Sequence, residues 1–152
     1  MDNWIKIADF SVGGFIWAGF SKVQTNKLIC ISSEYGAIVN CDTGKIEKCE
    51  SDYDEEKYIA ICDDLENEEI DIYGQYGGMP ILKTQYGESI SIKTQEELYG
   101  SKVVKRYKIN FETTDTNMEI YNNYGYYVCS FSPCGNYFVF AQDAGVTVYK
   151  RK

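Results

Sequence analysis

The chain has 152 residues, 44% of them hydrophobic, and a formal net charge of −8 from 15 basic and 23 acidic residues. This length holds one ordinary domain, and this apolar content excludes a wholly disordered chain. The negative charge disfavours binding to nucleic acid or to an anionic membrane and favours a basic partner.

Strand signals recur along almost the whole chain and predict an all-β protein. The 14 tyrosines, 7 phenylalanines and 2 tryptophans favour β structure, and the 13 glycines supply turns. Apolar or alternating runs bounded by turn residues occupy positions 15–20, 27–31, 35–41, 58–62, 70–73, 81–82, 89–92, 103–111, 126–131, 137–141 and 146–149. One segment favours a helix of about one turn, because Thr94 and Glu97 fit a capping box and Gly100 fits a C-terminal stop.

Acidic residues concentrate in one region. Positions 47–71 hold 12 of the 23 acidic residues against Lys48 and Lys57, so this segment carries −10 and the remainder of the chain +2. Such a patch steers a basic partner during association. We predict a partner-binding surface, with one acidic group in a loop before position 58 and another in the turn leading to position 70. Its candidate residues are Asp52, Asp54, Glu55, Glu56, Asp63, Asp64, Glu66, Glu68 and Glu69, joined by Tyr73 and Tyr76.

The sequence lacks the patterns of catalytic and metal sites. Without histidine, the chain has neither the most common general base nor the most common metal ligand. No Cys-x-x-Cys pair, EF-hand loop, Gly-x-Ser-x-Gly elbow or phosphate-binding glycine loop is present. We therefore expect no enzymatic activity, no metal and no cofactor.

The six cysteines stand at positions 30, 41, 49, 62, 129 and 134. The N-terminus shows no secretion signal, and no apolar run approaches the roughly 18 residues of a membrane-spanning helix. We expect reduced thiols, a cytoplasmic location and no membrane association.

Two other functions fit an acidic β domain. A carbohydrate-binding module could stack sugars on its tyrosines, for which the candidates are Tyr73, Tyr76, Tyr86, Tyr121, Tyr124, Tyr126 and Tyr127. A structural scaffold subunit of a larger assembly could share the same fold, and it would form a permanent oligomer.

The C-terminal stretch 128–149 resembles the inner three strands of a WD-repeat propeller blade. It has the turn Phe131-Ser132-Pro133-Cys134-Gly135, a second turn at 143–145 and a final alternating strand, with Tyr149-Lys150 in place of the family's Trp-Asp. Segment 35–46 resembles the outer strands of propeller blades. At about 40 to 50 residues per blade, the resemblance implies an open half-propeller of about three antiparallel meander blades. These would span roughly 10–49, 56–93 and 101–152 within a single domain, 1–152.

A small, acidic, histidine-free half-propeller is similar to the immunity proteins that neutralise EndoU-type ribonuclease toxins in bacterial contact-dependent growth inhibition. This resemblance implies a cytoplasmic protein that binds and inhibits a basic toxin nuclease domain. It also implies that the chain catalyses nothing itself. We expect it to be a monomer before it forms the complex.

Overall fold

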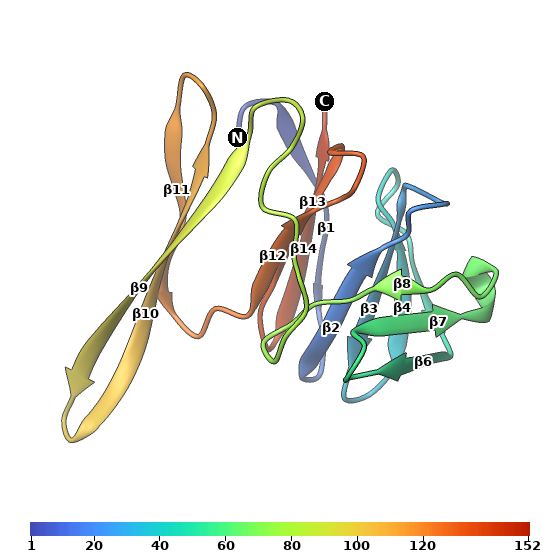
Figure 1. Cartoon of the computed structure of the whole chain (residues 1–152), viewed down its shortest axis with the longest axis horizontal. Coiled ribbons are helices and arrows are strands. Elements are labelled where there is room, and N and C mark those ends of the chain that lie inside the picture. Colours follow the sequence, from blue (N-terminus) through green and yellow to red (C-terminus); the bar gives the residue numbers. More distant parts are fainter.

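The computed structural model describes all 152 residues and confirms the all-β prediction. It contains fourteen β-strands and a single turn of 3-10 helix, Asp63–Leu65. The strands form four small antiparallel sheets, none of which closes on itself (Figure 1).

Each sheet contains three or four strands. The first has the order β1 (Trp4–Ser11), β14 (Gly145–Arg151), β13 (Tyr137–Ala141) and β12 (Val128–Phe131). The second has the order β2 (Phe15–Phe20), β3 (Lys27–Ser32), β4 (Gly36–Asn40) and β5 (Ile46–Cys49). The third has the order β6 (Ser51–Asp54), β7 (Ile59–Cys62) and β8 (Ile70–Asp71). The fourth has the order β11 (Asn117–Tyr124), β10 (Lys102–Glu112) and β9 (Ser89–Tyr99).

The four sheets lie side by side in the order β9–β11, β1/β12–β14, β2–β5 and β6–β8 (Figure 1), with an apolar layer between each pair of neighbours. The largest layer joins the two central sheets and includes Leu28 and Val139. A second layer packs Ile29 of the β2–β5 sheet against Ile70 of the β6–β8 sheet. The third joins the β9–β11 sheet to the β1/β12–β14 sheet around Phe111. The two central sheets therefore bury both faces, while each end sheet buries one.

This arrangement explains the sequence pattern of the strands. Strand β3 is buried from Leu28 to Ser32, and β13 is buried at four of its five residues. Both strands are apolar on both faces because each face meets a neighbouring sheet. Strand β10 alternates near its end, where Ile109 and Phe111 are buried and their neighbours are not.

The four sheets do not coincide with the ranges predicted for three blades. The range 10–49 corresponds to the β2–β5 sheet, but strand 89–92 belongs to β9 and pairs with β10 instead of with β6–β8. The range 101–152 is divided between two sheets, and β14 pairs with the N-terminal strand β1. Local patterns identify strands, whereas the choice of pairing partner depends on faces that are distant in the sequence.

The helix predicted from Thr94 to Gly100 is also wrong. This segment lies in β9, where Thr94 pairs with Tyr107 and Tyr99 pairs with Lys102. Gly100 has a φ of 64° in the two-residue turn that joins β9 to β10. One helical turn has few backbone hydrogen bonds to offset its nucleation cost, whereas the β10 ladder satisfies the same groups along eleven paired residues.

A connector of residues 72–88, here called the strap, runs from β8 to β9 and crosses the two central sheets (Figure 1). Ala18 of β2 and Tyr73 of the strap exchange two backbone hydrogen bonds of 2.9 Å. Further along, the Phe131 amide of β12 donates to the Ile81 carbonyl at 2.8 Å. The Ile81 amide donates to Ser130 Oγ at 2.9 Å. The strap thus pairs with the otherwise open edges of both central sheets.

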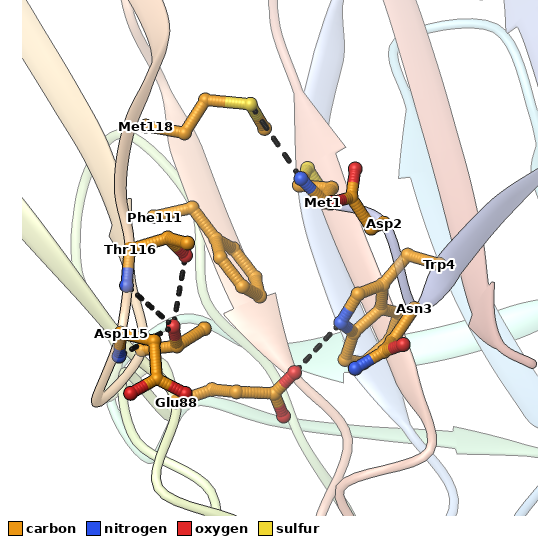
Figure 2. Close-up of a pocket in the computed structure, with 10 residues that line it drawn as sticks. Met1, Asp2, Asn3, Trp4, Glu88, Phe111, Asp115, Thr116 and Met118 are labelled. Atoms are coloured by element: carbon orange, nitrogen blue, oxygen red, sulfur yellow. Dashed lines mark hydrogen bonds between the residues drawn. The ribbon is translucent and has the colours of Figure 1, made fainter.

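The strap ends in a buried ion pair. Glu88 is 5% exposed and accepts a hydrogen bond from Trp4 Nε1 at 2.8 Å (Figure 2). It also accepts hydrogen bonds from Thr84 Oγ1 at 3.0 Å and from both terminal nitrogens of the Arg151 guanidinium. The guanidinium lies between the rings of Trp4 and Tyr86, at 4.6 and 4.2 Å from their centroids. This cluster joins the strap to strands β1 and β14.

Glu88→Gln should reduce the free energy of unfolding by about 3 kcal/mol at pH 7, because it leaves the Arg151 charge without its partner. Burial by itself raises the pKa of Glu88, but the hydrogen bonds from Arg151, Trp4 and Thr84 outweigh it and hold the pKa below its ordinary value. The carboxylate therefore stabilises the fold above the ordinary glutamate pKa, and this contribution is lost as the pH falls through the lowered pKa.

Urea unfolding of wild type and variant at several pH values measures this difference, which should shrink as the medium becomes acidic. The control is Glu47→Gln, which removes an exposed carboxylate paired with Lys45 and should leave the free energy of unfolding nearly unchanged. Equal effects of the two substitutions on the free energy of unfolding at pH 7 would show that the Glu88–Arg151 ion pair does not stabilise the fold.

Candidate protein-binding surface

The outer face of the β6–β8 sheet combines carboxylates with the exposed Ile61 and the half-buried Ile59. Asp52 pairs with Ile61, Asp54 with Ile59, and Ile59 with Asp71. Residues opposite one another in an antiparallel ladder share a face, so these five side chains lie on the outer face of the sheet. Asp71, at the edge of the sheet, forms an ion pair with Lys22 at 2.8 Å. The inner face packs against the β2–β5 sheet through Ala60, Cys62 and Ile70.

A concavity of about 250 Å³ opens on this outer face. Ile59 and Ile61 supply its apolar surface, and Ile61 is 37% exposed. We call it the acidic groove, and its lining residues are Asp52, Tyr53, Asp54, Lys57, Ile59, Ile61 and Glu69. None of its three carboxylates forms an ion pair within the protein.

The turn between β6 and β7 holds one of these carboxylates in place. Asp54 Oδ1 accepts hydrogen bonds from the backbone amides of Lys57 at 3.1 Å and Glu56 at 2.9 Å. These two bonds lower the pKa of Asp54, so it stays ionised at neutral pH. Tyr58 completes the turn with a φ of 55°. Its ring packs against the Trp17 ring, with 5.8 Å between the two ring centroids.

The second acidic group occupies the turn between β7 and β8. Asp63 and Asp64 begin the 3-10 turn and are exposed, while the buried Leu65 anchors this turn to the core. Glu66 and Asn67 follow with φ values of 56° and 57°. None of these residues lines the acidic groove.

Two predicted surface residues have structural roles. Glu68 is half-buried and accepts hydrogen bonds from Ser21 Oγ and, at 2.8 Å, from the Lys22 amide. Tyr73, predicted to contact a partner, is only 4% exposed and belongs to the largest apolar cluster. Its burial follows from the position of the strap, which runs across β2 at Ala18.

The other predicted residues are on the surface. They are Asp52, Asp54, Glu55, Glu56, Asp63, Asp64, Glu66, Glu69 and Tyr76. The fold brings Asp52, Asp54 and Glu69 together around one groove. Tyr76 lies on the strap and is 75% exposed.

Sequence reasoning missed the isoleucines of the groove. The run 58–62 is apolar at every position, so it shows no polar face that would identify Ile59 and Ile61 as outward-pointing. Ala60 and Cys62 are the buried members of the same strand. The alternating acids at positions 52 and 54 were the available signal, because they indicate a strand with one solvated face instead of the predicted loop.

Most of the tyrosines considered for sugar stacking have partners within the fold. Tyr121 and Tyr126 pack on Phe140 at 5.2 and 6.0 Å between ring centroids. Tyr124 donates a 2.7 Å hydrogen bond to Glu97, and Tyr86 packs against the Arg151 guanidinium. These side chains do not form one open aromatic platform.

Comparisons with protein-family models, with curated proteins and with solved structures found no match to this chain. No group of three or more Cys, Asp or Glu side chains is arranged to hold a metal ion. The structure contains no helix of the length and apolar character needed to span a membrane.

Separate substitutions of the two strap tyrosines test whether Tyr73 is buried in the core and Tyr76 is exposed on the surface. Tyr73→Ala should reduce the free energy of unfolding by about 3 kcal/mol, because it removes a buried aromatic ring from the largest apolar cluster. Tyr76→Ala should change it by no more than about 0.5 kcal/mol, because its side chain is exposed. Denaturant midpoints measured side by side give both values, and a silent Tyr73→Ala would contradict the position of the strap.

Proposed function

We propose that this protein is an inhibitory binding protein, an immunity protein whose acidic groove docks a basic ribonuclease toxin domain of the EndoU type. The observation that supports it best is the convergence of Asp52, Asp54 and Glu69 around the apolar surface of Ile59 and Ile61. A solubilising surface needs dispersed charge and no apolar floor. A docking surface benefits instead from concentrated charge and from an apolar floor.

The groove has the chemistry to receive a lysine or arginine side chain. The aliphatic stem of such a side chain can lie over Ile59 and Ile61, while its cationic end meets the rim carboxylates. An arginine can bind a carboxylate through two parallel hydrogen bonds. The rim carboxylates form no ion pair within the protein, so docking displaces none. Lys57 lines the same groove and offsets one of their three charges.

Inhibition follows from charge alone and requires no catalytic group in this chain. A ribonuclease binds the RNA phosphates through cationic groups. An acidic surface that covers these groups competes with RNA, and long-range attraction speeds its association with the toxin. Steric blocking beside the active site would have the same outcome.

We further propose that the four stacked sheets are blades of an open half-propeller. Face-to-face packing of four small antiparallel sheets, three of them meanders, supports this interpretation. In an open arc the last blade has no neighbour on its outer side, which leaves the acidic groove available to a partner. The proposed protein is cytoplasmic and monomeric until it meets the toxin.

The proposal expects a basic C-terminal nuclease domain to be encoded immediately upstream of the gene for this chain, and the test uses that domain. The wild-type protein should bind this domain and suppress its cleavage of RNA. The triple variant Asp52→Asn, Asp54→Asn, Glu69→Gln should associate about tenfold more slowly, because it removes the charges that steer the encounter. Raising the salt concentration should slow wild-type association more than that of the variant. Stopped-flow or biosensor kinetics provide these rates.

A matched control removes the same charge elsewhere. The variant Glu34→Gln, Glu47→Gln, Asp143→Asn neutralises three exposed acids outside the groove and should associate nearly as fast as wild type. Thermal unfolding of each variant separates lost docking from lost structure. Absence of any upstream basic nuclease domain, or failure of the wild type to inhibit it, would overturn the proposed function. Equal rates for the two triple variants would instead remove the groove as its docking site.

A further inference from the structure

Two of the six free cysteines meet at the junction between the β2–β5 and β6–β8 sheets. Cys49 ends β5, and only Glu50 separates it from Ser51, the first residue of β6. Ser51 pairs with Cys62 at the end of β7, which brings Cys62 back beside Cys49. Both side chains pack in the same apolar layer, and the Cys62 thiol is one of the groups that raise the pKa of Cys49.

The two thiols differ in their access to solvent. Cys62 is 1% exposed, whereas Cys49 is half-buried and lines a concavity of about 280 Å³. Ser33, Tyr35 and Ser51 form part of the same concavity. A small disulfide reagent can therefore reach Cys49 first and leave Cys62 as the adjacent thiol that completes the reaction.

We propose that Cys49 and Cys62 are a modification site at which oxidation forms a disulfide between the two neighbouring sheets. The reaction is thiol–disulfide exchange with a small disulfide such as oxidised glutathione. The Cys49 thiolate attacks one sulfur and releases one glutathione thiolate, which leaves a mixed disulfide. The Cys62 thiolate then attacks Cys49 Sγ, forms the protein disulfide and releases the second glutathione. Two protein thiols lose two electrons and two protons, and one glutathione disulfide becomes two thiols.

The electrostatic surroundings of Cys49 determine how fast this exchange proceeds. Burial, followed by the Cys62 thiol and the Asp64 carboxylate, raises the pKa of Cys49 to about 12. Only a small fraction is thiolate at pH 7, so the bridge forms slowly and its rate rises with pH. The high pKa of Cys49 also makes its sulfur a poor leaving group, so the formed disulfide is reduced slowly through attack on Cys62.

The other half-buried cysteine, Cys134, packs against the apolar layer that contains the buried Cys41. Its thiol is hydrogen-bonded to Ser132 Oγ at 3.3 Å. Cys129 is buried and contacts the Tyr126 hydroxyl at 3.6 Å. Cys30 and Cys41 are both buried. The Cys49–Cys62 bridge would attach the end sheet, which has a neighbour on one face only, covalently to the β2–β5 sheet.

The test treats the full-length protein with oxidised glutathione at about pH 9, where more of the thiol is ionised. Alkylation under denaturing conditions and mass spectrometry of unreduced peptides then locate the products. We expect a Cys49–Cys62 disulfide, with alkylation retained at the other four cysteines, and slower formation at pH 7. The oxidised protein should unfold at a higher temperature than the reduced protein.

Two variants distinguish this site from general thiol oxidation. Cys62→Ala should stop the reaction at a mixed disulfide of Cys49 with glutathione, because the completing thiol is gone. Cys134→Ser, the control, should form the Cys49–Cys62 bridge at the wild-type rate. If Cys62→Ala does not fold, Cys49→Ser at the more exposed position should show neither bridge nor adduct. Six alkylatable thiols in treated wild type, or adducts without the bridge, would overturn the proposal.

Discussion

The structure depends on the fact that a small antiparallel sheet has two faces and cannot bury either one alone. Stacking four such sheets creates three apolar layers, of 15, 9 and 7 buried residues, from a chain with no helix to cover them. The outermost face at each end of this stack has no neighbouring sheet and stays uncovered. The position of any binding surface is therefore tied to the packing that creates the core.

The strap and the Glu88 cluster hold this stack together across its edges. An open strand edge has unpaired backbone N–H and C=O groups that can pair with other strands. The strap forms backbone hydrogen bonds with some of these groups at Tyr73 and Ile81. Removing the charges of Glu88 and Arg151 from water is costly. Hydrogen bonds to every Glu88 lone pair and stacking of the guanidinium between Trp4 and Tyr86 offset that cost.

The two free faces differ in how their charges are satisfied. On the β9–β11 sheet, Arg106 bonds to Glu97 at 3.0 Å and to the Tyr124 hydroxyl at 3.0 Å, so the network is complete without a ligand. On the β6–β8 sheet, Asp71 pairs with Lys22, whereas Asp52 and Glu69 flank Ile59 and Ile61 and form no ion pair. These two carboxylates beside apolar surface support the proposal of a basic partner.

The sequence by itself determined the β class, most strand positions and the location of the acidic charge, because these depend on composition and on patterns of a few residues. Strand β13 coincides with the predicted range 137–141. Only the tertiary structure decided which strands pair, that Thr94 lies in a hairpin, that Tyr73 is buried and that Ile59 and Ile61 face outward. Each of these outcomes depends on which face of a strand meets a neighbour, and that neighbour is set by contacts between residues far apart in the chain.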